Sequence, residues 1–330
     1  MRICLLSKYG NSSNLLYEGT RFGLDKNNIT YLDINIENER GIEKLHWTSI
    51  PTLSPNKPLP ADITILQKIA DFQPDIILIL QYAGLPFLMD NGEKMRSILG
   101  EKGKICFWLV DLEEIIYHNE NLGRFIDHIF LSNSEQIQEY QQKWGVQKIF
   151  FMPQGAYVAK NFPNNLIKFD IGFLGRRQRE DPRYNNRNQI LDRFQETFGL
   201  EERDSVMDLD QTILFFQQNK INIGLSWKND VYLYSSDRIF NVLAAGGFYL
   251  CAYFPGIEKI FTNHTHLVWF HTAEEGVQLA KFYLNNELKR QQICENGFNL
   301  IKQKHTYTER VMNIINIVEE KTSVFNGFLS

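Results

Sequence analysis

Cysteine is scarce in this chain, and its spacing excludes the common cysteine-based sites. The four cysteines, Cys4, Cys106, Cys251 and Cys294, stand far apart without a CxxC pair, and the first three fall in apolar runs. This pattern favours buried free thiols in a reducing cytosol over disulfides or a metal centre, and it predicts a cytoplasmic protein. The seven histidines form no HxxxH or HExxH pair, so no metal site is predicted.

Long hydrophobic runs are missing as well. The longest apolar stretch, from Ile76 to Met89, is interrupted by Gln81, Gly84 and Pro86, and it is too short to span a bilayer. The opening residues, MRICLLS, are too short a run for a signal peptide. Neither a transmembrane segment nor a secretory leader is therefore expected.

The chain also lacks an excess of positive charge. Its 35 basic and 39 acidic residues give a net charge of −4 at pH 7, which argues against a general nucleic-acid binder. The GxSxG, P-loop and GxGxxG motifs do not occur. The sequence therefore carries no signature of an α/β-hydrolase, a P-loop NTPase or a dinucleotide-binding enzyme.

What the chain does contain is a regular alternation of strand-like and helix-like segments. Short runs rich in Ile, Leu, Val and Phe alternate with amphipathic stretches, which predicts an α/β protein with parallel sheets covered on both faces. A polar run, KNFPNN at 160–165, separates two such series, and 330 residues suit two domains. We predict domains at 1–162 and 163–330, with the last helix as a candidate to pack back on the first. The predicted strands are 2–7, 30–35, 75–80, 104–110, 128–132, 148–152, 170–174, 221–225, 248–253 and 266–270.

The segment from Ser235 to Phe261 carries the strongest signal. Its sequence, SSDRIFNVLAAGGFYLCAYFPGIEKIF, predicts a short helix, a Gly-Gly turn, a buried strand, a Pro-Gly turn and a second helix start. Ser236 or Asp237 is expected to cap the first helix. A helix N-terminus that carries Ser236, Asp237 and Arg238 is suited to bind a diphosphate or a ribose.

The run DIGFLGRRQRE is a second candidate binding element. Gly175 ends its predicted strand, and Arg176 and Arg177 follow. Glycine lets the backbone approach a bound phosphate, and arginine can grip a phosphate with two parallel N–H bonds. The alternative is a strand end with a solvated basic rim. Lys228, after the predicted strand 221–225, is either a further phosphate contact or a solvated surface lysine.

The Ser235–Phe261 segment resembles the donor-binding segment of GT-B fold glycosyltransferases of the group 1 type, in the CgeB-like (spore maturation protein) subgroup. The matching residues are Arg238, Phe240, Ala244, Gly246, Gly247, Pro255, Gly256, Glu258 and Phe261, and the closing HTYTERV run at 305–311 fits as well. The resemblance implies two Rossmann-like doubly wound domains that face each other across a cleft. It also implies a nucleotide-sugar donor and no required metal ion.

The same resemblance suggests further site residues. Asp111, just past the strand 104–110, corresponds to acidic residues that face the cleft, so it is a candidate general base, with a helix cap or loop residue as the alternative. Gly10, in the turn after the first strand, and Tyr157, in the PQGAY turn, are candidate ligand contacts. Asn241 stands where the family usually has the Glu that holds the donor ribose, and we expect it to face the ribose still. Leu233 replaces another Glu of the wider retaining families.

The sequence thus predicts a glycosyltransferase that moves a sugar from a nucleotide donor to a hydroxyl of a glycan, protein or small molecule, with retention of configuration. Two alternatives stay open. One is a catalytically inactive GT-B-like binding protein, which the changes at Asn241 and Leu233 motivate. The other is a transferase that modifies a nucleic-acid base, with the arginines between 176 and 193 as phosphate contacts.

Overall fold

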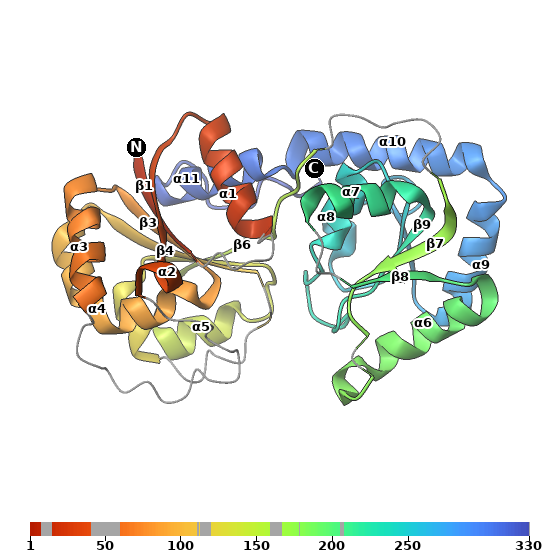
Figure 1. Ribbon diagram of the computed structural model, residues 1–330, viewed down its shortest axis with the longest axis horizontal. Coiled ribbons are helices and arrows are strands. Elements are labelled where there is room, and N and C mark those ends of the chain that lie inside the picture. The colour runs from red at the N-terminus through yellow and green to blue at the C-terminus, as the bar shows by residue number, and fades with distance from the viewer. Residues whose placement is uncertain are drawn as a thin grey trace. The chain divides into compact units, whose positions relative to one another are not determined.

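The computed structural model describes residues 1–7, 15–40, 60–110, 112, 120–158, 167–177, 179–204 and 208–329. The chain forms two compact units (Figure 1). Unit 1 comprises Met1–Pro153 and Arg310–Phe325, and unit 2 comprises Gln154–Glu309 and Asn326–Ser330. The α/β class with two parallel-sheet domains is confirmed. The predicted boundary between 162 and 163 lies outside the described residues and stays a prediction.

Unit 1 is built on a six-stranded parallel sheet with the order β2-β1-β3-β4-β5-β6. Its strands read as nearly continuous apolar runs because helices cover both faces of such a sheet. The strand IILIL, for example, is buried at every position. The strands are β1 (Arg2–Ser7), β2 (Thr30–Asn35), β3 (Ile76–Leu80), β4 (Lys104–Leu109), β5 (His128–Leu131) and β6 (Lys148–Phe151). The helices are α1 (Leu15–Lys26), α2 (Ile36–Arg40), α3 (Pro60–Phe72), α4 (Leu85–Leu99) and α5 (Ile137–Trp144).

The last helix, α11 (Tyr307–Val318), joins unit 1 from Arg310 onward. Arg310 is fully buried there, and its Nε donates to the carbonyl oxygen of Pro153 at 3.0 Å. Its guanidinium carbon also lies 4.6 Å from the centroid of the Phe325 ring. A buried guanidinium with these contacts fixes α11 to the segment that follows β6.

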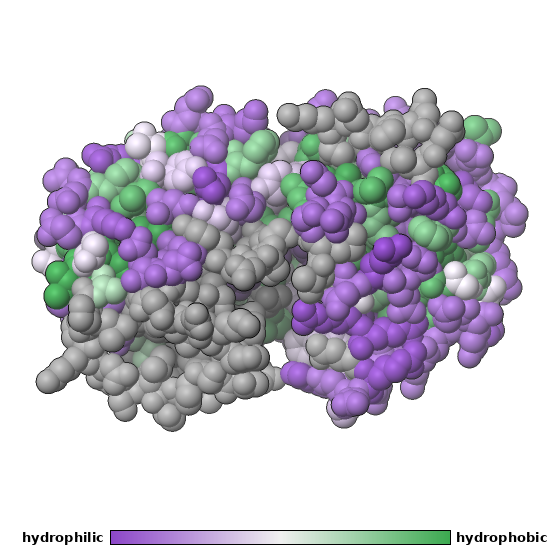
Figure 2. Space-filling view, in the orientation of Figure 1, coloured by the Kyte–Doolittle hydropathy of each residue, from purple (hydrophilic) through white to green (hydrophobic). Residues whose placement is uncertain are grey.

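Unit 2 has a five-stranded parallel sheet with the order β11-β10-β9-β7-β8. The strands are β7 (Phe169–Leu174), β8 (Glu201–Arg203), β9 (Asn219–Gly224), β10 (Tyr249–Ala252) and β11 (Val268–Phe270). The helices are α6 (Asn185–Phe198), α7 (Leu209–Gln218), α8 (Arg238–Ala244), α9 (Ala273–Leu284) and α10 (Glu287–Lys304). Figure 2 shows that the surface over α6 is mostly hydrophilic. Arg187 of this helix is nevertheless buried, and it belongs to the candidate site described in the next subsection.

The four cysteines are free, and Cys4, Cys106 and Cys251 are buried. Burial raises the pKa of each of these three thiols well above its usual range. The expectation of buried free thiols is therefore confirmed for these three positions, while Cys294 is partly exposed.

Candidate functional site

The strand order of unit 2 marks where a ligand is expected. The chain passes from β7 to β8 on one side and from β9 to β10 and β11 on the other, so its direction reverses between the neighbours β7 and β9. In open parallel sheets, ligands bind outside the carboxyl ends of the strands at such a switch point. Gly175 follows β7 and Leu225 follows β9. The side chains around these two residues form the candidate site.

Arg238, the first residue of α8, is held at this position by several contacts. Its Nη1 donates to the carbonyl oxygen of Leu225 at 3.1 Å, and its guanidinium carbon lies 5.2 Å from the centroid of the Phe173 ring. Its side chain also hydrogen-bonds Tyr249, whose hydroxyl has a pKa raised by burial. Gly224 leaves room for Tyr249, because a Cβ at that position would collide with the tyrosine ring. The predicted Arg238 is thus a fixed cation at the switch point.

Arg187 was predicted only as one of the arginines between 176 and 193 in the nucleic-acid alternative, and not as a contact of a nucleotide-sugar donor. It lies in the first turn of α6 and is only 6% exposed, yet its Nε and Nη2 have no hydrogen-bond partner among the described residues. Its guanidinium carbon lies 4.9 Å from the centroid of Phe173 and 5.4 Å from that of Tyr184. Burial, and next the charge of Arg238, lower the pKa of Arg187 to about 10. A buried cation without a counter-charge is costly, so this residue calls for an explanation.

A sequence signal for Arg187 did exist. The buried residues of α6 include Arg187, Ile190, Leu191 and Phe194, which follow the i, i+3, i+4, i+7 spacing of a core-facing helix stripe. The stripe therefore places an arginine where an apolar residue is expected. Such a substitution is a typical mark of a functional position.

Gly175 permits the close approach of Arg187. A Cβ at Gly175 would lie 2.7 Å from Nη2 of Arg187 and 2.9 Å from the ring of Phe173. Its φ of 154° is also one that other residues rarely adopt. The predicted role of Gly175 in a phosphate site stays a prediction, but its lack of a side chain is what lets the guanidinium reach the end of β7.

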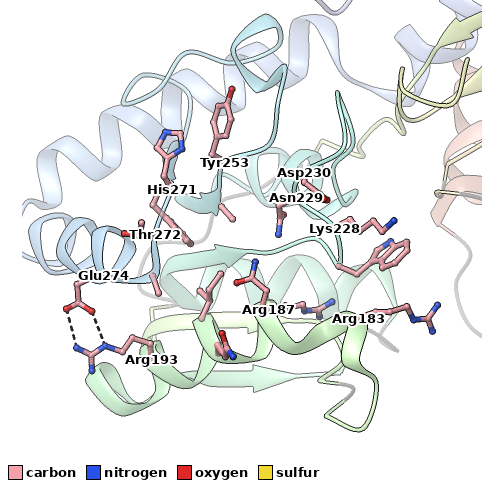
Figure 3. A pocket seen from close by; sticks show the side chains of 17 residues that line it. Arg183, Arg187, Arg193, Lys228, Asn229, Asp230, Tyr253, His271, Thr272 and Glu274 are labelled. Carbon is pink, nitrogen blue, oxygen red and sulfur yellow. Dashed lines mark hydrogen bonds and ion pairs between the residues drawn. The ribbon is translucent and has the colours of Figure 1, made fainter. Parts of the chain in front are cut away.

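A cavity of about 680 Å³ is lined in part by Arg187 (Figure 3). It lies between α6, the loop after β9 and the carboxyl ends of β10 and β11, and Arg187 and Lys228 both line it. Trp227 lines it too, fixed by a 2.9 Å bond from its Nε1 to the Tyr234 hydroxyl, with Nζ of Lys228 5.1 Å from its ring centroid. Lys228 and Arg187 thus share one cavity. Its volume matches that of a small-molecule site.

The remaining predicted arginines are engaged by carboxylates. Arg177 presents Nε and Nη2 to Glu202, each at 2.6 Å, and its Nη1 to Asp192. Arg176 is more than half exposed, and its Nε lies 3.3 Å from Oδ1 of Asp204. Neither lines the cavity above, so their predicted phosphate contacts stay predictions.

The polar residues around the start of α8 bind one another. Nδ2 of Asn241 donates to Oδ2 of Asp237 at 3.1 Å, and the Ser236 hydroxyl donates to Oδ1 of Asp237 at 3.1 Å. Asp237 makes no capping bond, whereas Oγ of Ser236 accepts a long 3.4 Å bond from the N–H of Arg238. The amide nitrogen of Asn241 thus has a protein partner. The expected contact of Asn241 with a ribose stays a prediction.

Leu233, which takes the place of the family's other Glu, is only 3% exposed. Its backbone has a φ of 58°, and its N–H donates to the carbonyl oxygen of Pro255 at 2.8 Å. This position therefore offers no side chain to a ligand in the cavity.

The other predicted residues lie elsewhere or outside the described residues. Gly10 and Asp111 are outside them, so both stay predictions. Tyr157 does not line the cavity, and its ring centroid lies 5.4 Å from that of Tyr307. Within the described ranges, no three His, Cys, Asp or Glu side chains gather as a metal site. Over the same ranges, no helix is long and apolar enough to cross a membrane.

Comparison with known protein families gives a match to the second half of the chain. Residues 176–316 match the model of a family described as glycosyl transferase-like. Most of this matched range lies in unit 2, and it includes Arg187 and Arg238. No curated protein matches the chain in sequence.

Several solved structures match nearly the whole chain. A glycosyltransferase from Rickettsia africae has a TM-score of 0.57 at 12% identity, with 97% of this chain and 98% of that chain covered. HepE from Anabaena in complex with UDP has a TM-score of 0.60 at 9% identity, with 97% and 100% covered. Sucrose-phosphate synthase from Thermosynechococcus elongatus has a TM-score of 0.59 at 9% identity, with 97% and 98% covered. The chain thus has the two-domain parallel-sheet fold of GT-B glycosyltransferases.

Proposed function

We propose that this protein is a glycosyltransferase that moves a sugar from a nucleotide-sugar donor to an acceptor hydroxyl. The observation that carries the proposal is the cavity beside the switch point of unit 2, which Arg187 and Lys228 line, together with Arg238, which lies against the same Phe173 ring as Arg187. The structural relative HepE was solved with UDP and with UDP-glucose, which supports a nucleotide sugar as the donor. We place the chain in the CgeB-like subgroup on the residues from Arg238 to Phe261.

The chemistry requires charge neutralisation at the donor. The bond between the anomeric carbon and the donor phosphate oxygen breaks, the acceptor oxygen bonds to that carbon, and the acceptor proton passes to a base, for which Asp111 is our candidate. The leaving phosphate group carries away the bonding electrons, and fixed guanidinium groups stabilise the charge that develops on it. Because Arg187 and Arg238 supply that charge, we propose transfer without a metal ion. We further propose retention of configuration and, from the buried free thiols, a cytoplasmic location.

The test is donor turnover. The purified protein is incubated with a panel of sugar nucleotides in the presence of EDTA, with glycans and small alcohols as acceptors, and release of the free nucleotide is measured. We expect slow release with one donor and faster release with a suitable acceptor, and proton NMR of the product then reports the anomeric configuration. Tight binding of a sugar nucleotide without any release would instead favour the inactive binding protein. No binding of any sugar nucleotide would refute the proposal.

A further inference from the structure

We propose that a second copy of this chain docks where α9 meets α10, so that the protein forms a dimer with two-fold symmetry. The docking surface, called the corner surface from here on, comprises Leu279, Phe282, Glu287, Leu288, Lys289 and Ile293. It belongs to unit 2 and lies where α9 ends and α10 begins (Figure 1). The proposal concerns assembly of the protein and goes beyond the proposed function.

The corner surface lies at the opposite end of the unit 2 sheet from the cavity in Figure 3. That cavity is lined by residues that follow the carboxyl ends of β10 and β11. The corner surface instead borders His264, which lies in the loop before β11. A second copy bound at the corner surface therefore leaves the cavity open.

The corner surface exposes apolar side chains to water. Leu288 is 82% exposed and Phe282 is 44% exposed. The two are neighbours, because Nζ of Lys289, the residue after Leu288, lies 4.9 Å from the centroid of the Phe282 ring. Single exposed apolar residues are common, but a group of them beside a groove is typical of a surface that binds another molecule.

A groove of about 600 Å³ runs beside Leu288. Its apolar walls are formed by Leu279 and Phe282 of α9 and by Ile293 of α10, and Lys289 lines it as well. Leu288 lines neither this groove nor the smaller hollow that Glu287 lines, so it projects between the two. One surface thus carries both a projecting leucine and an apolar groove that can receive one. Such self-complementarity is what a dimer with two-fold symmetry requires.

The charges beside Leu288 favour a second copy over other occupants. Glu287 and Lys289 flank Leu288 with opposite charges. When Leu288 of each copy enters the groove of the other, Glu287 of one copy meets Lys289 of the second, and the same pair forms again across the two-fold axis. An anionic membrane would be repelled by Glu287, and a small apolar ligand in the groove would leave Leu288 in water. A second copy covers the whole corner surface.

The experiment is sedimentation equilibrium over a series of protein concentrations. The proteins are the wild type, Leu288→Ser, Glu287→Lys, Lys289→Glu and the control Leu214→Ser. Leu214 belongs to α7 of the same unit, is 41% exposed and does not line the groove. Circular dichroism verifies the fold of each variant, and all five positions are exposed or conservative enough in size to leave the core unchanged.

We expect the wild type and Leu214→Ser to dimerise with the same dissociation constant. Leu288→Ser should weaken the dimer at least tenfold, because each copy then buries a serine in place of a leucine. Glu287→Lys and Lys289→Glu should each weaken the dimer when alone, because like charges then meet across the axis. An equimolar mixture of these two variants should dimerise again, because every lysine then meets a glutamate.

Two results would overturn the proposal. One is a wild type that stays monomeric throughout the concentration series, and the other is a dimer that neither Leu288→Ser nor the charge variants weaken. Binding of a monomeric wild type to phosphatidylglycerol vesicles, lost in Leu288→Ser, would assign the corner surface to a membrane and overturn the dimer as well. The proposed function is tested separately by donor turnover, so its failure is distinguishable from failure of the dimer.

Discussion

Replacing Arg187 with methionine should make the ligand-free protein more stable. A guanidinium whose pKa is about 10 in the folded protein, against an ordinary 12.5, is disfavoured as a cation by about 3 kcal/mol. Because the folded pKa is lowered, the whole penalty is present at pH 7.5, and it is relieved only as the pH rises through about 10 toward 12.5. Methionine has a similar length and carries no charge, so it removes this penalty.

Part of the gain is offset by lost stacking. Arg187 lies over the rings of Phe173 and Tyr184, and each such contact is worth about 0.5–1 kcal/mol. The expected net effect of Arg187→Met is therefore an increase of about 1–2 kcal/mol in the free energy of unfolding. An ordinary structural arginine behaves in the opposite way, because its removal leaves a carboxylate without a partner.

Arg177→Met supplies the matched control. The Arg177 side chain is 12% exposed and binds Glu202 and Asp192, so its replacement should lower the free energy of unfolding by about 1–3 kcal/mol. The assay is urea unfolding at pH 7.5 in a buffer without phosphate or sulfate, followed by circular dichroism and tryptophan fluorescence. If Arg187→Met proved less stable than the wild type while keeping its fold, Arg187 would have a structural partner. Our reasoning that Nε and Nη2 of Arg187 have no partner among the described residues would then be refuted.

Three further predictions concern other positions. Burial lowers the pKa of His128 to about 4, so between pH 6.5 and 4 the wild type should lose about 3 kcal/mol more stability than His128→Leu, which urea unfolding at several pH values would measure. Gly175→Ala should weaken nucleotide binding at least tenfold because its Cβ would meet Arg187, whereas titration of Gly199→Ala, which has open space around its Cβ, should show wild-type affinity. Asn241→Glu should lower the free energy of unfolding by about 1 kcal/mol, because it replaces a hydrogen bond to Asp237 with a like charge one helical turn away, and an added Asp237→Asn should restore it; additive losses in this double-variant cycle would contradict the pairing.

The strands of the sheet interiors were predictable, and one edge strand was not. A strand such as β3 is covered on both faces, so its sequence is a continuous apolar run that has few other interpretations. Strand β8 (Glu201–Arg203) lies at the edge of its sheet, where polar side chains face water, and its sequence EER carries no such signal. The start of β9 at Asn219 and Lys220 was missed for a related reason. Asn219 is polar but buried, and its Nδ2 donates a hydrogen bond to the carbonyl oxygen of Phe215 that only the folded chain provides.

The residues of the candidate site also divide into those whose surroundings come from nearby sequence and those whose surroundings come from distant residues. Arg238 was predictable as the start of a helix, because the signals for α8, from the turn before it to the Gly-Gly pair after it, are adjacent in the sequence. Its side-chain contacts with Leu225 and Phe173 are not local and were not predicted. Arg177 was predicted as a phosphate contact because it closely follows Gly175, and this stays a prediction. Its carboxylate partners Asp192 and Glu202 lie 15 and 25 residues away. Nothing local to Arg177 reveals that those carboxylates return to it.

The position of Arg187 depends both on its neighbours in the sequence and on residues that are distant in the sequence. Its place on the apolar stripe of α6 is visible in the sequence, while its closeness to Arg238 depends on the sheet order that puts β7 beside β9. The Phe173 ring lies against both guanidinium groups, so the core of β7 supports the site directly. A buried arginine on the core-facing side of the helix after a strand-end glycine is therefore a stronger indication of an anion site than the arginines directly after that glycine. The reason is that a buried arginine cannot be explained by an ion pair on the protein surface.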